Sequence, residues 1–201
     1  LLAMRTKAKI KYIEIDDQGR LILDDLDTLL TERTKVVALG HVSNALGTIN
    51  PIKQIAAAAK KVGALVVIDG AQGAVHTKVD VQDLGVDCYA FSGHKMCGPT
   101  GIGVLWARKE LLESMHPYQG GGEMIHIVGR DESSWAEVPH KFEAGTPNIA
   151  GAIGMGAAVD FLGTIGMDAI AAHERDLMEY AVEQVGAVGG IKIYGPESLD
   201  E

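Results

Sequence analysis

The sequence has too few cysteines for a disulfide framework or a four-cysteine zinc site, because Cys88 and Cys97 are its only two. It contains no uninterrupted apolar run of about 18 residues, which is the length that a membrane-spanning helix needs. The start of the chain, Leu1 to Arg5, lacks the layout of a signal peptide. These features favour a cytoplasmic protein in a reducing compartment, with no membrane segment and no metal cluster.

Excess positive charge is also missing. The net charge is −9, and no basic patch is set apart from the acidic residues. A surface of this kind repels nucleic acids and anionic membranes. Aromatic residues make up only 5% of the chain, whereas 47% of its residues are hydrophobic and 25 are glycine. This composition is typical of a glycine-punctuated α/β enzyme rather than of a disordered or fibrous protein.

Apolar runs with the character of strands alternate with helical patterns through the first half of the chain. A helix is predicted to begin at Pro51 and to end at Gly63, because apolar residues recur every three or four positions between them. Residues 64–68 are continuously apolar, which predicts a strand buried on both faces. The other predicted strands are 10–15, 35–39, 87–91 and 102–106, with a short helix at 26–30. This alternation predicts an open, mostly parallel sheet flanked by helices.

The second half of the chain has a different pattern. Residues 116–148 contain a run of three glycines and few helical repeats, so we predict a long functional loop or a small hairpin. Helices are predicted at 149–162 and at 168–186. Residues 191–194 resemble the first strand of another domain. Since the chain lacks an initiator methionine and stops soon after this strand, we expect a fragment of a longer protein.

Polar residues directly follow three of the predicted strands, in the segments 41–44, 69–72 and 92–95. Ligands of open α/β sheets gather at the carboxyl ends of the strands, so these segments are the first candidates for a binding site. Taken alone, Asp69 fits a turn or helix-capping residue, and Lys95 fits a solvated surface charge. Only the combination of the two points to chemistry.

An acid and an amine at strand ends of one sheet suit the chemistry of pyridoxal phosphate (PLP). This cofactor needs an amine for imine formation, an acid that keeps its pyridine nitrogen protonated, and hydrogen-bond donors around its phosphate. Asp69 supplies the acid and Lys95 supplies the amine. Ser92 and His94 add a hydroxyl and an imidazole beside the amine.

Four ordered motifs, at residues 41–48, 67–73, 91–103 and 141–147, now make a family resemblance visible. The chain resembles the SUF-type (group II) cysteine desulfurases and selenocysteine lyases, which are fold-type I PLP enzymes of the class V aminotransferase family. The resemblance covers essentially the whole chain. It implies a PLP-binding large domain over 1–150, incomplete at its N-terminus. Residues 151–201 would then form linking helices and the truncated start of the C-terminal domain.

The resemblance also implies roles for individual residues. Lys95 would bind PLP as a Schiff base and later shuttle the Cα proton of the substrate. Asp69 would pair with the pyridinium nitrogen, and Gln72 would hydrogen-bond the phenolic oxygen of the ring. Ser92 and His94 would hold the phosphate.

Two further residues take roles from the resemblance alone. Asn44 would approach the substrate or the ring oxygen. Thr146 would reach the phosphate of the neighbouring subunit's cofactor, which makes a homodimer part of the expected active site. The glycine run 120–122 would belong to a mobile segment near that interface, or to an ordinary solvent loop.

The activity implied by the resemblance is PLP-dependent desulfuration of L-cysteine, or of L-selenocysteine, with alanine as product. Sulfur would pass to an enzyme persulfide and then to an acceptor protein for iron–sulfur cluster assembly. The family's sulfur-accepting cysteine, substrate-binding arginine and ring-stacking histidine fall outside this chain, so we expect no turnover by this polypeptide alone. Another class V enzyme, such as an aminotransferase or a kynureninase-like hydrolase, and a non-catalytic dimerisation module remain alternatives.

Several residues that invite a functional interpretation are better explained by structure. Cys97 lies two residues after Lys95, but packing is its expected role, and Cys88 is expected in the core. His41 and His76 lack ligand-spaced partners, so we interpret them as hydrogen-bonded structural histidines. Residues 98–103 do not form a nucleotide phosphate loop, since no Gly-Lys-Ser/Thr follows.

Overall fold

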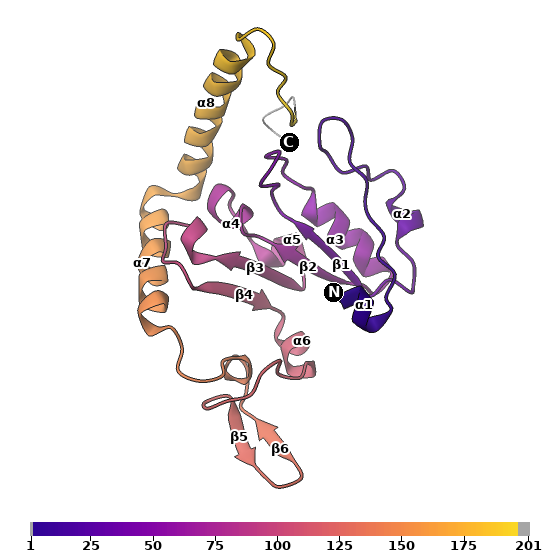
Figure 1. Cartoon of the computed structure of the whole chain (residues 1–201), viewed down its shortest axis with the longest axis vertical. Coiled ribbons are helices and arrows are strands. Elements are labelled where there is room, and N and C mark those ends of the chain that lie inside the picture. The colour runs from indigo at the N-terminus through magenta and orange to yellow at the C-terminus, as the bar shows by residue number, and fades with distance from the viewer. Residues whose placement is uncertain (1, 197–201) are drawn as a thin grey trace.

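The computed structural model describes residues 2–196 as an α/β structure (Figure 1). Its strands are β1 (Val36–Gly40), β2 (Leu65–Asp69), β3 (Cys88–Ser92), β4 (Gly103–Ala107), β5 (Ile125–Val128) and β6 (Ser133–Trp135). Its helices are α1 (Leu2–Thr6), α2 (Leu26–Leu29), α3 (Ile52–Lys61), α4 (Gly73–His76), α5 (Val81–Leu84), α6 (Lys109–Ser114), α7 (Ile149–Ile165) and α8 (Met167–Gly186). Two short 3₁₀ turns are η1 (Gly93–Lys95) and η2 (His140–Phe142).

The main sheet has the strand order β1-β2-β3-β4. The first three strands are parallel, and β4 returns antiparallel to β3 with Gly103 opposite Ser92. The prediction of an open, mostly parallel sheet flanked by helices is therefore confirmed. Helices separate β1 from β2 and β2 from β3, whereas only η1 and a tight loop separate β3 from β4.

The larger part of the hydrophobic core lies between α3 and the sheet. Ile55 and Ala59 on α3 and Val66 and Ile68 on β2 are all completely buried. The predicted helix follows from its local sequence, with apolar residues on one face and Gly63 at φ +72° just beyond its end. Burial of each large apolar side chain in this cluster contributes on the order of 1.5–3 kcal/mol to the stability of the fold.

A second, smaller cluster packs α7 against the loop that follows β3. It consists of Val75, Met96, Met155 and Leu162. Gly154 lets α7 pack closely against Pro99, because a Cβ on Gly154 would lie 2.6 Å from the Cγ of Pro99. Helix α7 therefore supports the segment that contains η1.

Three of the predicted strand features are wrong. Residues 10–15 form no strand, and only an isolated bridge joins Ile15 to Leu21. Residues 191–194 have no regular structure. Strand β2 is buried on one face only, since Val66 and Ile68 are buried while Leu65 and Val67 are half-buried. An alternating or apolar pattern shows which face can be buried, but it does not show whether a neighbouring layer covers that face.

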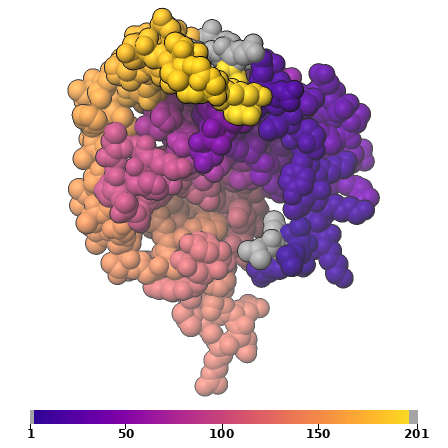
Figure 2. Space-filling view, turned by 45° about the horizontal axis from the view of Figure 1, so that its top comes forward, coloured from indigo at the N-terminus to yellow at the C-terminus, as the bar shows by residue number. Residues whose placement is uncertain are grey.

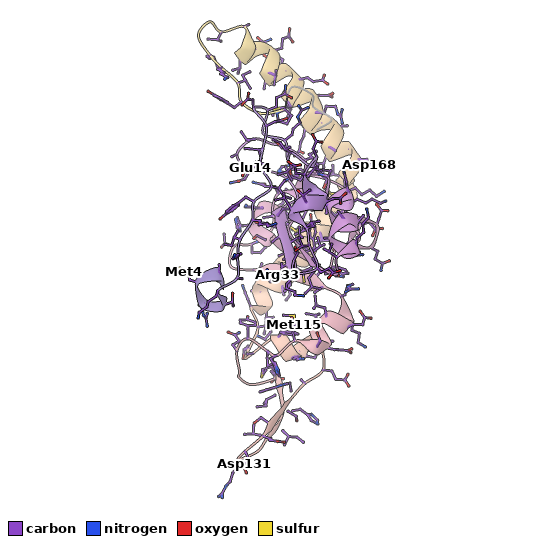
Figure 3. The ribbon with its side chains drawn as sticks, turned by 90° about the vertical axis from the view of Figure 1, so that its right-hand side faces the viewer. Met4, Glu14, Arg33, Met115, Asp131 and Asp168 are labelled. Carbon is purple, nitrogen blue, oxygen red and sulfur yellow. The ribbon has the colours of Figure 1, made fainter. Side chains whose placement is uncertain are left out.

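The long segment between α6 and α7 contains the antiparallel hairpin β5–β6, which confirms the predicted excursion. The hairpin projects from the body of the molecule in the space-filling view (Figure 2). In the side view, Asp131 marks its tip, and Met4 on α1 lies apart from the main body (Figure 3). Helix α8 extends away from the sheet near Asp168, and none of its side chains is buried.

Candidate active site

The three polar segments predicted from the sequence meet at one edge of the sheet. Strand β1 leads into His41, β2 ends at Asp69 and β3 ends at Ser92. The His41 N–H donates to the carbonyl of Asp69 at 2.8 Å, and the Gly70 N–H donates to that of Ala90 at 2.7 Å. Since the strands are parallel, their carboxyl ends and the loops that follow lie side by side, with α4 beginning at this edge (Figure 1).

The acid and its neighbours occupy the loop after β2. Asp69 is exposed, and its Oδ1 accepts a hydrogen bond from the Ala71 N–H at 2.9 Å. This bond orients the carboxylate at the end of the strand and leaves the second oxygen available. Gln72 is half-buried directly before α4, and its side chain does not cap the helix. The loop therefore presents a carboxylate and an amide at the sheet edge.

The amine lies in the loop after β3. Lys95 and His94 are exposed in η1, and Ser92 is half-buried at the end of β3. The loop closes on itself, because the Gly98 N–H donates to the carbonyl of Gly93 at 2.9 Å. Met96 is 7% exposed and anchors the loop in the cluster with α7. One buried side chain thus holds the loop in place while the preceding lysine stays accessible.

The hydrogen-bonding groups of these side chains are available to a ligand. Within residues 2–196, the side chains of Gln72, Ser92, His94 and Lys95 make no hydrogen bond or ion pair with the protein. Together with Asp69 they offer an acid, an amine, an amide, a hydroxyl and an imidazole at one sheet edge. This donor and acceptor set fits the amine, acid and phosphate-donor requirements of PLP.

Asn44 lies on the third loop of the same edge. The Ser43 carbonyl accepts from the Gly47 N–H at 3.0 Å, and the Ser43 hydroxyl accepts from the Leu46 N–H at 3.2 Å. These bonds close a turn in which Asn44 is exposed. The structure thus brings six of the seven predicted residues to loops at one edge, while their individual roles stay predictions.

Thr146 lies on a separate segment that other elements hold. The Gly145 N–H donates to the carbonyl of Gly122 at 2.9 Å. The buried Lys141 donates from Nζ to the carbonyls of Leu112 and Glu113, at 3.2 and 3.0 Å, near the end of α6. The motif at 141–147 therefore combines an exposed threonine with a structural lysine, whose capping role the sequence did not reveal.

His41 and Tyr89 form a buried pair beneath the site, and only the structural role of His41 was predicted from the sequence. His41 is buried and its Nδ1 lies 2.9 Å from the hydroxyl of Tyr89, which confirms it as a hydrogen-bonded structural histidine. Burial lowers the pKa of His41. Burial, with a smaller contribution from the charge of Asp69, raises the pKa of Tyr89. Tyr89 was not predicted from the sequence, although Gly70 and Gly73, which pack against it, were the available signal.

Of the other residues predicted to be structural, His76 and Cys88 have that role and Cys97 does not. His76 pairs with Glu174 on α8 at 2.9 Å, as expected of a structural histidine. Cys88 is buried as predicted, and burial, followed by the charge of Asp87, raises the pKa of its thiol. The packing role predicted for Cys97 is wrong, because a left-handed φ of 63° turns the chain there and leaves Cys97 exposed.

No single helix in residues 2–196 is long and apolar enough to span a membrane; α7 and α8 reach that length and apolarity only as a pair bent by 73°. The same residues bring together no group of three or more histidine, cysteine, aspartate or glutamate side chains that could hold a metal ion.

Comparisons with known proteins agree with this geometry. The profile of the family "Aminotransferase class-V" matches residues 1–201. A probable cysteine desulfurase of Streptomyces coelicolor is 55% identical over 201 residues, which are 100% of this chain and 48% of that protein. A cysteine desulfurase of Haloferax volcanii is 48% identical over 99% of this chain and 47% of its own length. The chain spans about half the length of the curated relatives it matches.

A solved structure shows the same fold. The cysteine desulfurase CsdA of Escherichia coli superimposes with a TM-score of 0.93 at 40% identity, over 98% of this chain and 50% of that one. The fold-type I prediction is therefore confirmed.

Proposed function

Because the chain belongs to the class V aminotransferase family, we propose that it carries the PLP-binding part of a cysteine desulfurase. The full reaction would convert L-cysteine, or L-selenocysteine, to L-alanine and leave the sulfur as an enzyme persulfide for iron–sulfur cluster assembly. One observation carries the proposal: an acid, an amine and three further polar side chains, all with free hydrogen-bonding groups, lie on two adjoining strand-end loops. The relatives named cysteine desulfurase support the reaction class.

The roles of the residues follow from their chemistry. Lys95 would bind the cofactor covalently through its amine and would later accept and return the Cα proton of the substrate. Asp69 would hold a proton on the pyridine nitrogen by charge-assisted hydrogen bonding. Gln72 would hydrogen-bond the phenolic oxygen, and Ser92 and His94 would hold the phosphate. When bound, PLP supplies the electron sink that stabilises negative charge at Cα.

The substrate and the partners belong to the same proposal. Asn44, on the neighbouring loop, would contact the substrate or the ring oxygen. Thr146, on its separate segment, would contact the phosphate of the cofactor in the partner subunit of a homodimer. A sulfur-acceptor protein and a cytoplasmic location complete the proposal. Its parts can be tested separately, beginning with the cofactor.

Reductive trapping of the cofactor tests the site directly. The purified protein is incubated with PLP, reduced with borohydride, digested and mapped by mass spectrometry. We expect one stoichiometric pyridoxyl group on Lys95, and loss of this label in Lys95→Ala. Lys78→Ala removes another exposed lysine and serves as the matched control, with labelling of Lys95 unchanged. Labelling spread equally over surface lysines, or undiminished in Lys95→Ala, would contradict the proposal.

The acid is tested with Asp69→Asn. This variant keeps an acceptor for the Ala71 N–H but removes the negative charge. We expect trapping at Lys95 to persist, with the absorption band of the bound cofactor shifted and its pH titration altered, because a neutral amide does not hold the pyridinium proton. An unchanged titration would remove Asp69 from the proposed site.

A further inference from the structure

A buried hydrogen bond beneath the site joins two of its strand ends. The Nδ1 atom of His41 and the hydroxyl of Tyr89 are 2.9 Å apart, although the residues are 48 positions apart in the sequence. Their relative exposures are 6% and 1%. The rings meet edge to face, with centroids 5.8 Å apart and an interplanar angle of 87°. The pair therefore connects the end of β1 to β3 and passes under the loop that follows β2.

The loop that carries Asp69 and Gln72 rests directly on this pair. A Cβ added at Gly70 would lie 1.9 Å from Cε1 of Tyr89. A Cβ added at Gly73 would lie 2.5 Å from Nδ1 of His41 and 2.7 Å from the hydroxyl of Tyr89. Only glycine permits this approach, since real Cβ atoms do not come within 3.0 Å of other heavy atoms.

Backbone contacts turn this packing into a constraint on the acid. The His41 N–H donates to the carbonyl of Asp69 at 2.8 Å. The Asp69 carboxylate in turn accepts from the Ala71 N–H, within the loop that the two glycines press onto Tyr89. A displacement of either ring would therefore move the backbone from the Asp69 carbonyl to Gly73, the segment that holds the carboxylate.

We propose that His41 and Tyr89 are positioning residues that set the height and direction of the Asp69–Gln72 loop toward the ligand at the sheet edge. The identity of that ligand as PLP rests on the function proposed above. Neither ring needs to touch the ligand, because their effect passes through Gly70 and Gly73 to the carboxylate and the amide. The pair therefore lies beneath the side chains that would contact the ligand and holds them in position.

The electrostatic environment suits a neutral pair. Burial lowers the pKa of His41, so its imidazole stays uncharged near neutral pH. Burial and the nearby charge of Asp69 raise the pKa of Tyr89, so its phenol stays protonated. A neutral hydrogen bond under a carboxylate orients the loop without neutralising the acid.

Tyr89→Phe tests the proposal, because it removes the hydroxyl and keeps the ring that the glycines contact. We expect the dissociation constant for PLP to rise about five- to tenfold, as for the loss of one buried hydrogen bond. The absorbance-monitored pH titration of the cofactor bound at Lys95 should also shift. Tyr180→Phe on the exposed face of α8 is the matched control and should change neither measurement.

A partner variant and a second measurement complete the test. His41→Gln keeps a hydrogen-bonding side chain and should restore part of the affinity that His41→Ala loses. Amide hydrogen exchange of residues 69–73 in the protein without PLP should speed up about tenfold in Tyr89→Phe. A lower melting temperature with unchanged titration, affinity and loop exchange would show a merely structural pair and overturn the proposal.

The two proposals fail in different ways. Absence of PLP binding in the wild-type protein would refute the proposed function. The exchange rates of residues 69–73 would still decide whether the pair holds the loop: faster exchange in Tyr89→Phe supports it, and unchanged exchange overturns it.

Discussion

Replacing Asp87 with alanine tests the link that joins three strands at the edge of the sheet opposite the site. Asp87 is 2% exposed and directly precedes β3. Its Oδ2 accepts from the Val66 N–H at 2.7 Å, and its Oδ1 lies 2.8 Å from Nε of Arg108. The Arg108 N–H also donates to the Asp87 carbonyl at 3.1 Å, so one residue joins β2, β3 and the end of β4.

The size of the effect follows from what each partner loses. Val66 is completely buried, so its N–H would lose its acceptor without access to water. An orphaned buried donor costs about 1–3 kcal/mol. The Arg108 side chain is 49% exposed and can be rehydrated, so losing its bond to the carboxylate adds only about 0.5–1 kcal/mol. We expect Asp87→Ala to lower the free energy of unfolding by about 1.5–4 kcal/mol, a large share of the usual 5–15 kcal/mol.

Urea denaturation, followed by circular dichroism, measures this change. Asp83→Ala is the matched control, because Asp83 also pairs with a cation, Lys53, but both side chains are more than 60% exposed. That substitution should cost at most about 0.5 kcal/mol. Asp87→Asn keeps an acceptor for Val66 and should fall between the two. Equal losses in Asp87→Ala and Asp83→Ala would refute the reasoning from burial.

Three further predictions concern the helices and the buried histidine. Lys141→Met removes two hydrogen bonds from the end of α6 and should lower the free energy of unfolding in urea by about 1–2 kcal/mol, whereas Lys141→Arg should cost less. Gly156 lies inside α7, and a Cβ there would meet no atom within 4 Å apart from the adjacent backbone of its own helix, so Gly156→Ala should stabilise the protein by about 0.5–1 kcal/mol. A Cβ at Gly154 would meet Pro99, so Gly154→Ala should not raise the melting temperature. Since burial lowers the pKa of His41 from its ordinary 6.5, the unfolded chain takes up the proton first as pH falls. The contribution of neutral His41 to the free energy of unfolding is therefore complete above pH 6.5 and is lost as pH falls through the lowered pKa. His41→Gln should flatten this pH dependence of the free energy of unfolding, measured by urea denaturation at a series of pH values.

The local sequence was sufficient to predict those helices and strands whose structure depends mainly on their own residues. Helix α3 was predicted because its apolar residues fall on one face and a glycine follows it. The strands β1 to β4 were predicted to within one or two residues from their apolar runs. The same logic failed at residues 10–15, because their alternating pattern has no partner strand, and Ile10 and Tyr12 remain 60% and 71% exposed. Short helices such as α4 and α5 carry too few residues for a periodic signal.

The sequence by itself determined the candidate site, because Asp69, Ser92 and Lys95 stand at or just beyond the carboxyl ends of apolar strands, and parallel strands bring those ends to one edge. Only the tertiary structure decided which bonds support that site and the fold around it. His41 meets Tyr89 across 48 residues, Asp87 meets Val66 across 21, and Lys141 meets the end of α6 across 28. No local pattern encodes such pairs, since each depends on how separate elements pack. The accessible lysine follows from the chain order, whereas the buried bond beneath the acid follows from the fold.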